Sequence, residues 1–206
     1  MPERHSIQLV TLPMGPWQTN CFILTSGGQA VIVDPAGEPR QILHAAGGTE
    51  VGAILLTHGH PDHVGALGEV RAATGAPVGI HPADAAAFNL EADFALEDGM
   101  EIDFGKGQLA VYHTPGHTPG SVCFRFDSRA LVGDTLFPGG PGHSKSPAAL
   151  AEILNSLREV LFTWPDELYF IPGHGHGSTL GAVRPAYEAF LARPLPADLC
   201  GDVEWG

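Results

Sequence analysis

Residues 57–63 read THGHPDH, and this stretch decides how the rest of the chain is interpreted. It follows directly after residues 53–56, a fully apolar run with the length of a buried strand. Four of its seven residues carry imidazole or carboxylate groups, and glycine and proline separate them, so the loop can turn several side chains inward. Imidazole and carboxylate are ligands for zinc, iron or manganese. The candidate ligands in this loop are His58, His60, Asp62 and His63.

Three further candidate ligands occupy equivalent places later in the chain. Each lies just past the carboxyl end of an apolar run of strand length and next to a glycine. Strand ends gather on one edge in α/β folds, so we expect these side chains to meet the first four. Seven nitrogen and oxygen donors are enough for two metal ions with open positions. The three are His117 after residues 109–113, Asp134 after residues 130–132, and His174 after residues 168–171, with His176 as the alternative to His174.

Short strands and helices alternate along the whole chain. The best helical pattern, residues 147–162, has a proline in its first turn and apolar residues at three- and four-residue spacing. Strands mixed with helices in two successive halves predict an α/β (α+β) fold with two packed sheets and helices outside. Strands are expected at residues 7–12, 21–25, 30–34, 52–56, 77–80, 109–113, 121–126, 129–132 and 168–171, and helices at residues 39–46, 64–74, 82–88, 147–162 and 180–192.

Length and charge limit the classes of function. The 206 residues predict a single domain over residues 1–206. The formal net charge is −13, and the lysines are Lys106 and Lys145. A surface this acidic repels phosphate backbones, so we expect no nucleic-acid partner. The apolar runs are far too short to span a bilayer, so we expect no membrane partner either.

The cysteines and the N-terminal sequence predict the compartment. Cys21, Cys123 and Cys200 form no CxxC pair and leave one thiol unpaired. The sequence MPERHSIQLV lacks the apolar segment of a signal peptide. Both observations predict a cytoplasmic protein with reduced, structural thiols. The sequence sets no oligomeric state.

With its motifs THGHPDH, TPGHTPGS, GDTLF and PGHG in this order, the chain resembles the metallo-β-lactamase-fold hydrolases. The resemblance covers nearly the full length and implies a four-layer αββα sandwich. It also implies two divalent metal ions as cofactors, zinc above all, with iron or manganese as alternatives. By position, the resemblance assigns His58, His60 and His117 to one ion, Asp62, His63 and His174 to the second, and Asp134 to both as a bridge.

Within this superfamily the motifs are most similar to those of the hydroxyacylglutathione hydrolases (glyoxalase II) and their short bacterial relatives. The zinc β-lactamases of this fold place a cysteine or no ligand at the position of Asp134, which argues against antibiotic hydrolysis. Full-length glyoxalase II carries a C-terminal helical region that helps to hold glutathione, whereas residues 175–206 contain few basic residues. The resemblance therefore implies a small acyl-thioester substrate without fixing the thiol.

Two carboxylates are the expected catalytic residues. Two ions that share Asp134 also share a water molecule, and bridging lowers its pKa toward neutrality. The resulting hydroxide is expected to attack the acyl carbonyl, with Asp62 both binding a metal and orienting this nucleophile, while a metal stabilises the tetrahedral oxyanion. A thiolate leaves without prior protonation because a thiol pKa is only about 8.5.

Three residues outside the ligand set are candidates for supporting roles. Asp34 is expected to hydrogen-bond an imidazole, or else to end its strand as a turn residue before Pro35. The glycine- and proline-rich residues 137–145 are expected to form a substrate wall. Within this wall Lys145 is expected to contact a substrate carboxylate, with a solvated loop lysine as the alternative, and His143 to assist it.

Other functions fit part of the same pattern. Persulfide dioxygenases resemble this sequence in the same motifs but hold one iron with two histidines and one aspartate, here His58, His117 and Asp134. Lactone or ester hydrolysis is a further variant of the hydrolase. A binding protein with structural zinc would saturate its metal with four protein groups, often cysteines, whereas this donor set indicates open positions.

Overall fold

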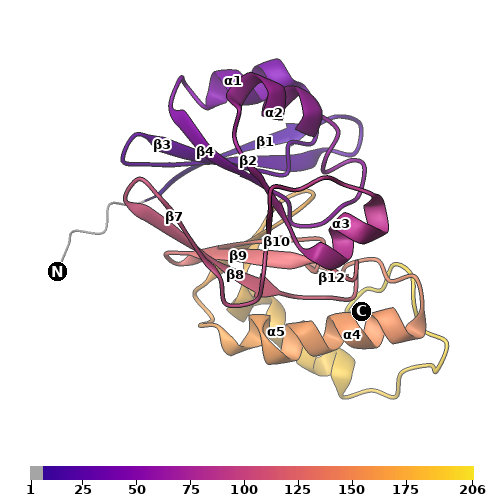
Figure 1. Cartoon of the computed structure of the whole chain (residues 1–206). Helices are drawn as coiled ribbons and strands as arrows, with labels where there is room; N and C mark the ends of the chain where they lie inside the picture. The colour runs from indigo at the N-terminus through magenta and orange to yellow at the C-terminus, as the bar shows by residue number, and fades with distance from the viewer. Residues whose placement is uncertain (1–6) are drawn as a thin grey trace.

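Three apolar cores lie one above another in the computed structural model, which describes residues 7–206. The middle core lies between two β-sheets, and each outer core lies between a sheet and its helices (Figure 1). Strand β2 (Thr19–Ser26) faces two cores, because Phe22 belongs to the middle core and Ile23 to an outer one. Three cores require four layers, and the predicted αββα sandwich is confirmed.

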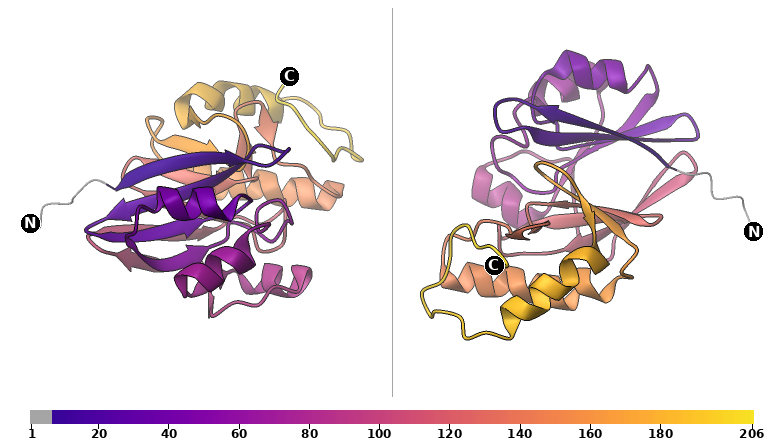
Figure 2. Two further views of the ribbon diagram at one scale, coloured as in Figure 1. Left: turned by 90° about the horizontal axis from the view of Figure 1, so that it is seen from above. Right: turned by 180° about the vertical axis from the view of Figure 1, so that it is seen from behind.

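The first sheet has the strand order β1-β2-β3-β4-β5-β6. Its first three strands are antiparallel, and β3 to β6 are parallel. Helices α1 and α2 cover its outer face, which Figure 2 shows from two further sides. They pack on it through the fully buried Ile42 and Val70. The elements are β1 (Gln8–Met14), β2, β3 (Gln29–Val33), α1 (Pro39–Ala45), β4 (Glu50–Leu55), α2 (Leu67–Thr74), β5 (Val78–Ile80), α3 (Pro82–Phe88) and β6 (Phe94–Ala95).

The second sheet has the strand order β14-β13-β10-β9-β8-β7. Helices α4 and α5 cover its outer face and bury Leu150, Ile153 and Phe190 against it. A small hairpin, β11 with β12, leads into α4. The elements are β7 (Glu101–Phe104), β8 (Gly107–His113), β9 (Val122–Phe126), β10 (Arg129–Gly133), β11 (Leu136–Phe137), β12 (Gly140–Pro141), α4 (Pro147–Glu159), a 3₁₀ turn (Leu161–Thr163), β13 (Tyr169–Pro172), β14 (Ser178–Thr179) and α5 (Leu180–Leu191).

Every predicted strand and helix occurs, the helix at residues 82–88 with the expected ends and the others with at least one shifted end. The helix expected from residue 64 begins at Leu67, because the N–H of Ala66 is bound to the carbonyl of Pro35 and this holds the preceding residues in a loop. The helix expected to reach residue 162 ends at Glu159, and a 3₁₀ turn follows. The sequence does not predict β6, β7, β11, β12 and β14, which are two to four residues long.

The direction of the strands in the second sheet determines at which edge the loops that carry the candidate ligands lie. Strand β9 is antiparallel to both β8 and β10, and β13 is parallel to β10. The carboxyl ends of β8, β10 and β13 therefore share one edge of the second sheet. None of the helices in residues 7–206 combines the length and apolar character needed to cross a bilayer. The single domain over residues 1–206 stays a prediction.

Candidate metal centre

The loops after β4, β8, β10 and β13 bring the seven predicted donors into one cluster. Three sets of three residues each offer ligand atoms that lie within 4.8 Å of one another. The sets overlap, because one shares His58 with the first and His63 with the third. All seven side chains therefore belong to one centre between the two sheets. The sets are His58–His60–His117, His58–His63–Asp134 and Asp62–His63–His174.

The ligand atoms of the three-histidine set lie close together. His60 Nδ1 lies 3.0 Å from His58 Nε2 and 2.9 Å from His117 Nε2. Ligands of a tetrahedral zinc ion at ordinary bond lengths are roughly 3.3 Å apart, so this spacing fits one cation. Burial lowers the pKa of all three imidazoles, that of His60 to about 4. Near neutral pH these rings are uncharged, which is the form that binds a metal.

The set of Asp62, His63 and His174 has a different charge state. His174 Nε2 lies 3.3 Å from Asp62 Oδ2 and 3.4 Å from His63 Nε2. Burial alone would lower the pKa of His174, but its contact with Asp134 raises it to about 9. In the same way Asp34 overcomes burial and raises the pKa of His63. A cation that enters this set therefore displaces protons.

Asp134 lies between the two sets. Its Oδ1 lies 3.6 Å from His63 Nε2, and its Oδ2 lies 3.6 Å from His117 Nε2. Although burial opposes the charge, the neighbouring histidines hold the pKa of Asp134 below its usual value. Oδ1 is buried without a hydrogen-bond partner among residues 7–206, and a buried carboxylate oxygen of this kind needs a cation or a donor. Gly173 leaves room for it, because a Cβ there would collide with Oδ1.

The outward-facing nitrogen of four of the five histidines has an acceptor. A carbonyl or carboxylate oxygen only accepts, and the Thr57 hydroxyl donates to Asp34, so all four of these nitrogens carry a proton. This arrangement fits a divalent metal site, since it leaves the inner nitrogens as the ones that bind a cation, in the second set after a proton has left. The pairs are His58 Nδ1 with Thr57 Oγ1 at 3.0 Å, His63 Nδ1 with Asp34 Oδ2 at 2.9 Å, His117 Nδ1 with the His143 carbonyl at 2.9 Å, and His174 Nδ1 with the Trp17 carbonyl at 3.0 Å.

Asp34 supports two of these rings at once. It is fully buried, directly after β3, and its φ of 51° places it in the left-handed region. Its carboxylate accepts hydrogen bonds from His63 Nδ1 and from both the N–H and the hydroxyl of Thr57, at 2.9, 2.7 and 2.6 Å. The Thr57 hydroxyl, having donated to Asp34, accepts from His58. Both expectations for Asp34 agree with this geometry, since it ends a strand and contacts an imidazole.

Two polar residues of β2 also hold the centre, and the sequence reasoning missed them. The hydroxyl of Thr19 donates to Asp62 Oδ2 at 3.1 Å. The amide of Asn20 donates to the carbonyls of Pro172 and Gly175, both at 2.9 Å, on either side of His174. Nothing in the local sequence marks these residues, because their partners are more than 40 positions away.

The predicted substrate residues lie on one side of the centre. Lys145 is exposed, and its Nζ lies 6.0 Å from the centre of the Phe88 ring. Phe88 stands edge-on to His60, with ring centres 5.2 Å apart. The exposed imidazole of His143 is bound to Asp202 at 2.9 Å, so its contact with the centre runs through its carbonyl.

The alternative ligand His176 is exposed and belongs to none of the donor sets found in residues 7–206. His174, by contrast, faces both carboxylates of the cluster. The preference for His174 at the end of β13 therefore agrees with the geometry.

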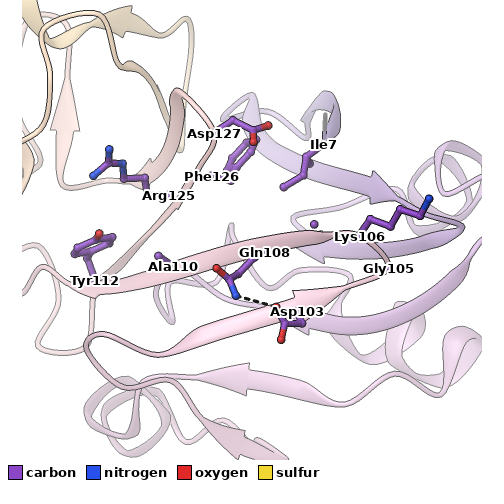
Figure 3. A pocket seen from close by; sticks show the side chains of 11 residues that line it. Ile7, Asp103, Gly105, Lys106, Gln108, Ala110, Tyr112, Arg125, Phe126 and Asp127 are labelled. Carbon is purple, nitrogen blue, oxygen red and sulfur yellow. Dashed lines mark hydrogen bonds between the residues drawn. The ribbon is translucent and has the colours of Figure 1, made fainter. Parts of the chain in front are cut away.

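A pocket of about 760 Å³ lies apart from the centre, near the turn between β7 and β8 (Figure 3). It is lined by polar side chains such as Asp103, Gln108 and Arg125, and Asp103 accepts a hydrogen bond from Gln108 at 2.9 Å. His117, in contrast, follows the opposite end of β8. None of the residues that line this pocket belongs to the donor cluster.

The order of the donors and the fold around them match one known family. The family model described as the metallo-beta-lactamase superfamily matches residues 14–174, which include the whole donor cluster. The chain belongs to the metallo-beta-lactamase superfamily. Members of this superfamily are mostly metal-dependent hydrolases, and the histidine and aspartate cluster suggests a divalent metal site in this member too.

Individual members of the superfamily are similar over most of their length. A hydroxyacylglutathione hydrolase from Anaeromyxobacter dehalogenans is 44% identical, over 88% of this chain and 77% of that protein. Among solved structures, TTHA1623 in a di-iron-bound form is 36% identical with a TM-score of 0.72, over 84% of this chain and 96% of the other. The BLEG-1 B3 metallo-beta-lactamase is 28% identical with a TM-score of 0.75, over 85% and 95% of the two chains.

Proposed function

We propose that this protein is a binuclear metal-dependent hydrolase of a small acyl thioester, similar to the hydroxyacylglutathione hydrolases. The observation that carries the proposal is the place of Asp134, whose carboxylate oxygens lie within 3.6 Å of histidines from both donor sets. A carboxylate in this place is suited to two divalent ions bound side by side. In this proposal His58, His60 and His117 bind the first ion, Asp62, His63 and His174 bind the second, and Asp134 binds both.

Divalent ions in this centre supply Lewis acidity toward an acyl carbonyl and make a water molecule acidic enough to attack it at neutral pH. The residues of the chain hold and orient the reactants. Asp62, fixed by the hydroxyl of Thr19, orients the attacking water. Solvent and substrate can reach the centre at Asp62 and His174, whose side chains are 30% and 26% exposed, and at His60, which is also partly exposed.

The rim near His60 suits a substrate that carries an anionic group. Phe88 and Lys145 place an aromatic ring and an ammonium group on this side of the centre. We assign to Lys145 a carboxylate of the acyl or thiol portion, with His143 next to it. A thioester is favoured over an amide because a thiolate leaves without a proton, whereas an amine does not.

The direct test supplies S-lactoylglutathione and related acyl thioesters to the metal-loaded protein and measures thiol release. We expect turnover that a chelator abolishes and added metal restores. Asp134→Asn should lose turnover by several orders of magnitude while its circular dichroism stays unchanged. Asp127→Asn is the matched control, since Asp127 lies at the opposite end of β10 and should keep full activity. The proposal fails if no thioester is cleaved in a metal-dependent manner.

Two arms of this test separate the other candidates. A chromogenic β-lactam is included because a B3 metallo-beta-lactamase is among the similar structures. Iron-dependent persulfide oxidation is the second candidate, because His58, His117 and Asp134, the three ligands that it requires, all belong to the donor cluster. Metal analysis of protein purified without added metal decides between persulfide oxidation and thioester hydrolysis. One iron per chain with persulfide-dependent oxygen uptake supports the oxidation, and two zinc ions with thiol release support the hydrolase.

A further inference from the structure

A second buried carboxylate, Asp84, contacts both loops that supply the three-histidine set. It lies in the first turn of α3 and is fully buried. Its Oδ2 accepts hydrogen bonds from the N–H of Gly59 and the hydroxyl of Thr118, both at 2.8 Å. Its Oδ1 accepts a third from the N–H of Gly120, at 2.7 Å. Sequence patterns did not single out this residue.

These contacts lie directly beside the histidines of one donor set. Gly59 stands between His58 and His60, and Thr118 follows His117. The first loop follows β4 of the first sheet, whereas the second follows β8 of the second sheet. Asp84 thus bonds to two loops from different sheets at the point where their imidazoles converge. Metal–ligand distances tolerate errors of only about 0.2 Å, so the separation of these loops matters for binding.

The chemistry of the contacts requires a carboxylate. The three hydrogen-bond donors are uncharged, and among residues 7–206 no basic side chain forms an ion pair with Asp84. A buried charge of this kind is stable because its oxygens are fully hydrogen-bonded. An asparagine has one acceptor oxygen, and its NH₂ group would face an N–H group. Only a side chain with two acceptor oxygens therefore satisfies all three hydrogen-bond donors.

Helix α3 packs closely against both loops around Asp84. A Cβ at Gly120 would lie 2.6 Å from the backbone nitrogen of Asp84, and a Cβ at Gly59 would collide with the ring of Phe88. Both glycines thus allow α3 to approach the two loops at main-chain distance. Helix α3 is docked on the centre through its buried carboxylate and its aromatic ring.

We propose that Asp84 is a positioning residue for the three-histidine half of the metal centre. It fixes the loop of His58 and His60 and the loop of His117 at the separation that one divalent cation requires. Asp34 has a parallel task for His63 and, through the hydroxyl of Thr57, for the ring of His58. The inference rests on the metal centre of the proposed function but not on its reaction.

The test measures metal binding without substrate. Metal-free wild-type protein and Asp84→Asn are titrated with Zn²⁺ against a chromophoric chelator, and with Co²⁺ by visible absorption. We expect the wild type to bind two ions. In D84N one ion should bind about 10- to 100-fold more weakly, with a changed Co²⁺ spectrum, while the other keeps its affinity.

A control and a second variant complete the experiment. Asp93→Asn is the matched control, because Asp93 also accepts a backbone N–H, that of Val78 at 2.8 Å, but contacts neither loop. It should retain both affinities. Thr118→Val removes one donor and leaves the carboxylate, so it tests the same ion even where D84N fails to fold, and a smaller loss is expected.

Three results would overturn the inference. They are wild-type affinities and spectra in D84N and T118V, an equal loss for both ions, and the same selective loss in D93N. A wild-type protein that binds no divalent cation would instead overturn the metal centre of the proposed function, so the two failures are distinguishable.

Discussion

At the scale of single residues, the candidate metal ligands are easier to recognise in the sequence than the groups that orient them. His58 and Asp134 stand next to glycines at strand ends, and their chemistry marks them. The carbonyls of Trp17 and His143, which accept hydrogen bonds from His174 and His117, belong to the main chain. Every residue type has a carbonyl, so the sequence carries no signal for these contacts. For His117 and His174, the choice of tautomer is therefore set by the folded backbone.

Asp34→Asn tests the support that Asp34 gives to His63 and, through Thr57, to His58. Asparagine tolerates the left-handed backbone of this position, so the fold should persist. Because asparagine has a single acceptor oxygen, one of the hydrogen-bond donors on Thr57 and His63 loses its acceptor. We therefore expect a metal affinity about 10- to 100-fold lower than that of the wild type. Chelator competition measures it. Asp127→Asn, also at a positive φ but far from the centre, is the control, and equal affinities in the two variants would contradict the expectation.

The thiols give a second test at this scale. Cys21 and Cys123 are fully buried, and burial is the main reason that the pKa of each is raised, that of Cys123 to about 12. A raised pKa keeps a thiol protonated, and the protonated form is unreactive. At pH 8 we expect an aromatic disulfide reagent to titrate only the exposed Cys200 rapidly, and all three thiols after denaturation. Rapid reaction of two or more thiols in the native protein would contradict this burial.

At the scale of elements, the long strands and helices are predictable because each has its own apolar pattern. Strand β10 is a continuous apolar run buried on both faces, and helix α4 buries residues at helical spacing. Strands such as β7 and β14 are made by pairing with a neighbour, and their few residues carry no such pattern. For the same reason the C-terminal residues 199–205 give no sequence signal, although they contact the loop that carries His143.

The C-terminal segment provides a prediction at this scale. Trp205 is 5% exposed and packs against Phe190 with ring centres 5.2 Å apart, and its main-chain N–H donates to the Gly139 carbonyl. Trp205→Ala should lower the free energy of unfolding by about 3–5 kcal/mol. It should also increase the mobility of the loop that contains His143, whose carbonyl accepts the hydrogen bond from His117.

Trp17→Ala is the matched control for this variant. Trp17 is 73% exposed, so its loss should change the free energy of unfolding by less than about 0.5 kcal/mol. Urea unfolding compares the two variants. Equal losses would show that the segment around Trp205 does not stabilise the second sheet.

At the scale of the whole molecule, the sequence predicts the site better than it explains how the site is held. The common direction of β8, β10 and β13 follows from strand pairing, and it brings His117, Asp134 and His174 to one edge. Which edge of the first sheet faces them depends on how the two sheets pack. That packing is fixed by the middle core, whose members come from both halves of the chain and have no local relation in sequence.

The position of the centre between the sheets predicts that metal stabilises the whole fold. The first sheet supplies His58, His60, Asp62 and His63, and the second supplies His117, Asp134 and His174, so a bound cation joins the two halves. A ligand that binds only the folded state stabilises it by about 2.7 kcal/mol at a free concentration of 100 Kd. We therefore expect a chelator to lower the Tm, and free Zn²⁺ to raise it in proportion to the logarithm of its concentration. Asp134→Asn should flatten this dependence, whereas Asp127→Asn should reproduce the wild-type slope. A Tm that is independent of metal in the wild type would show that no cation joins the two sheets.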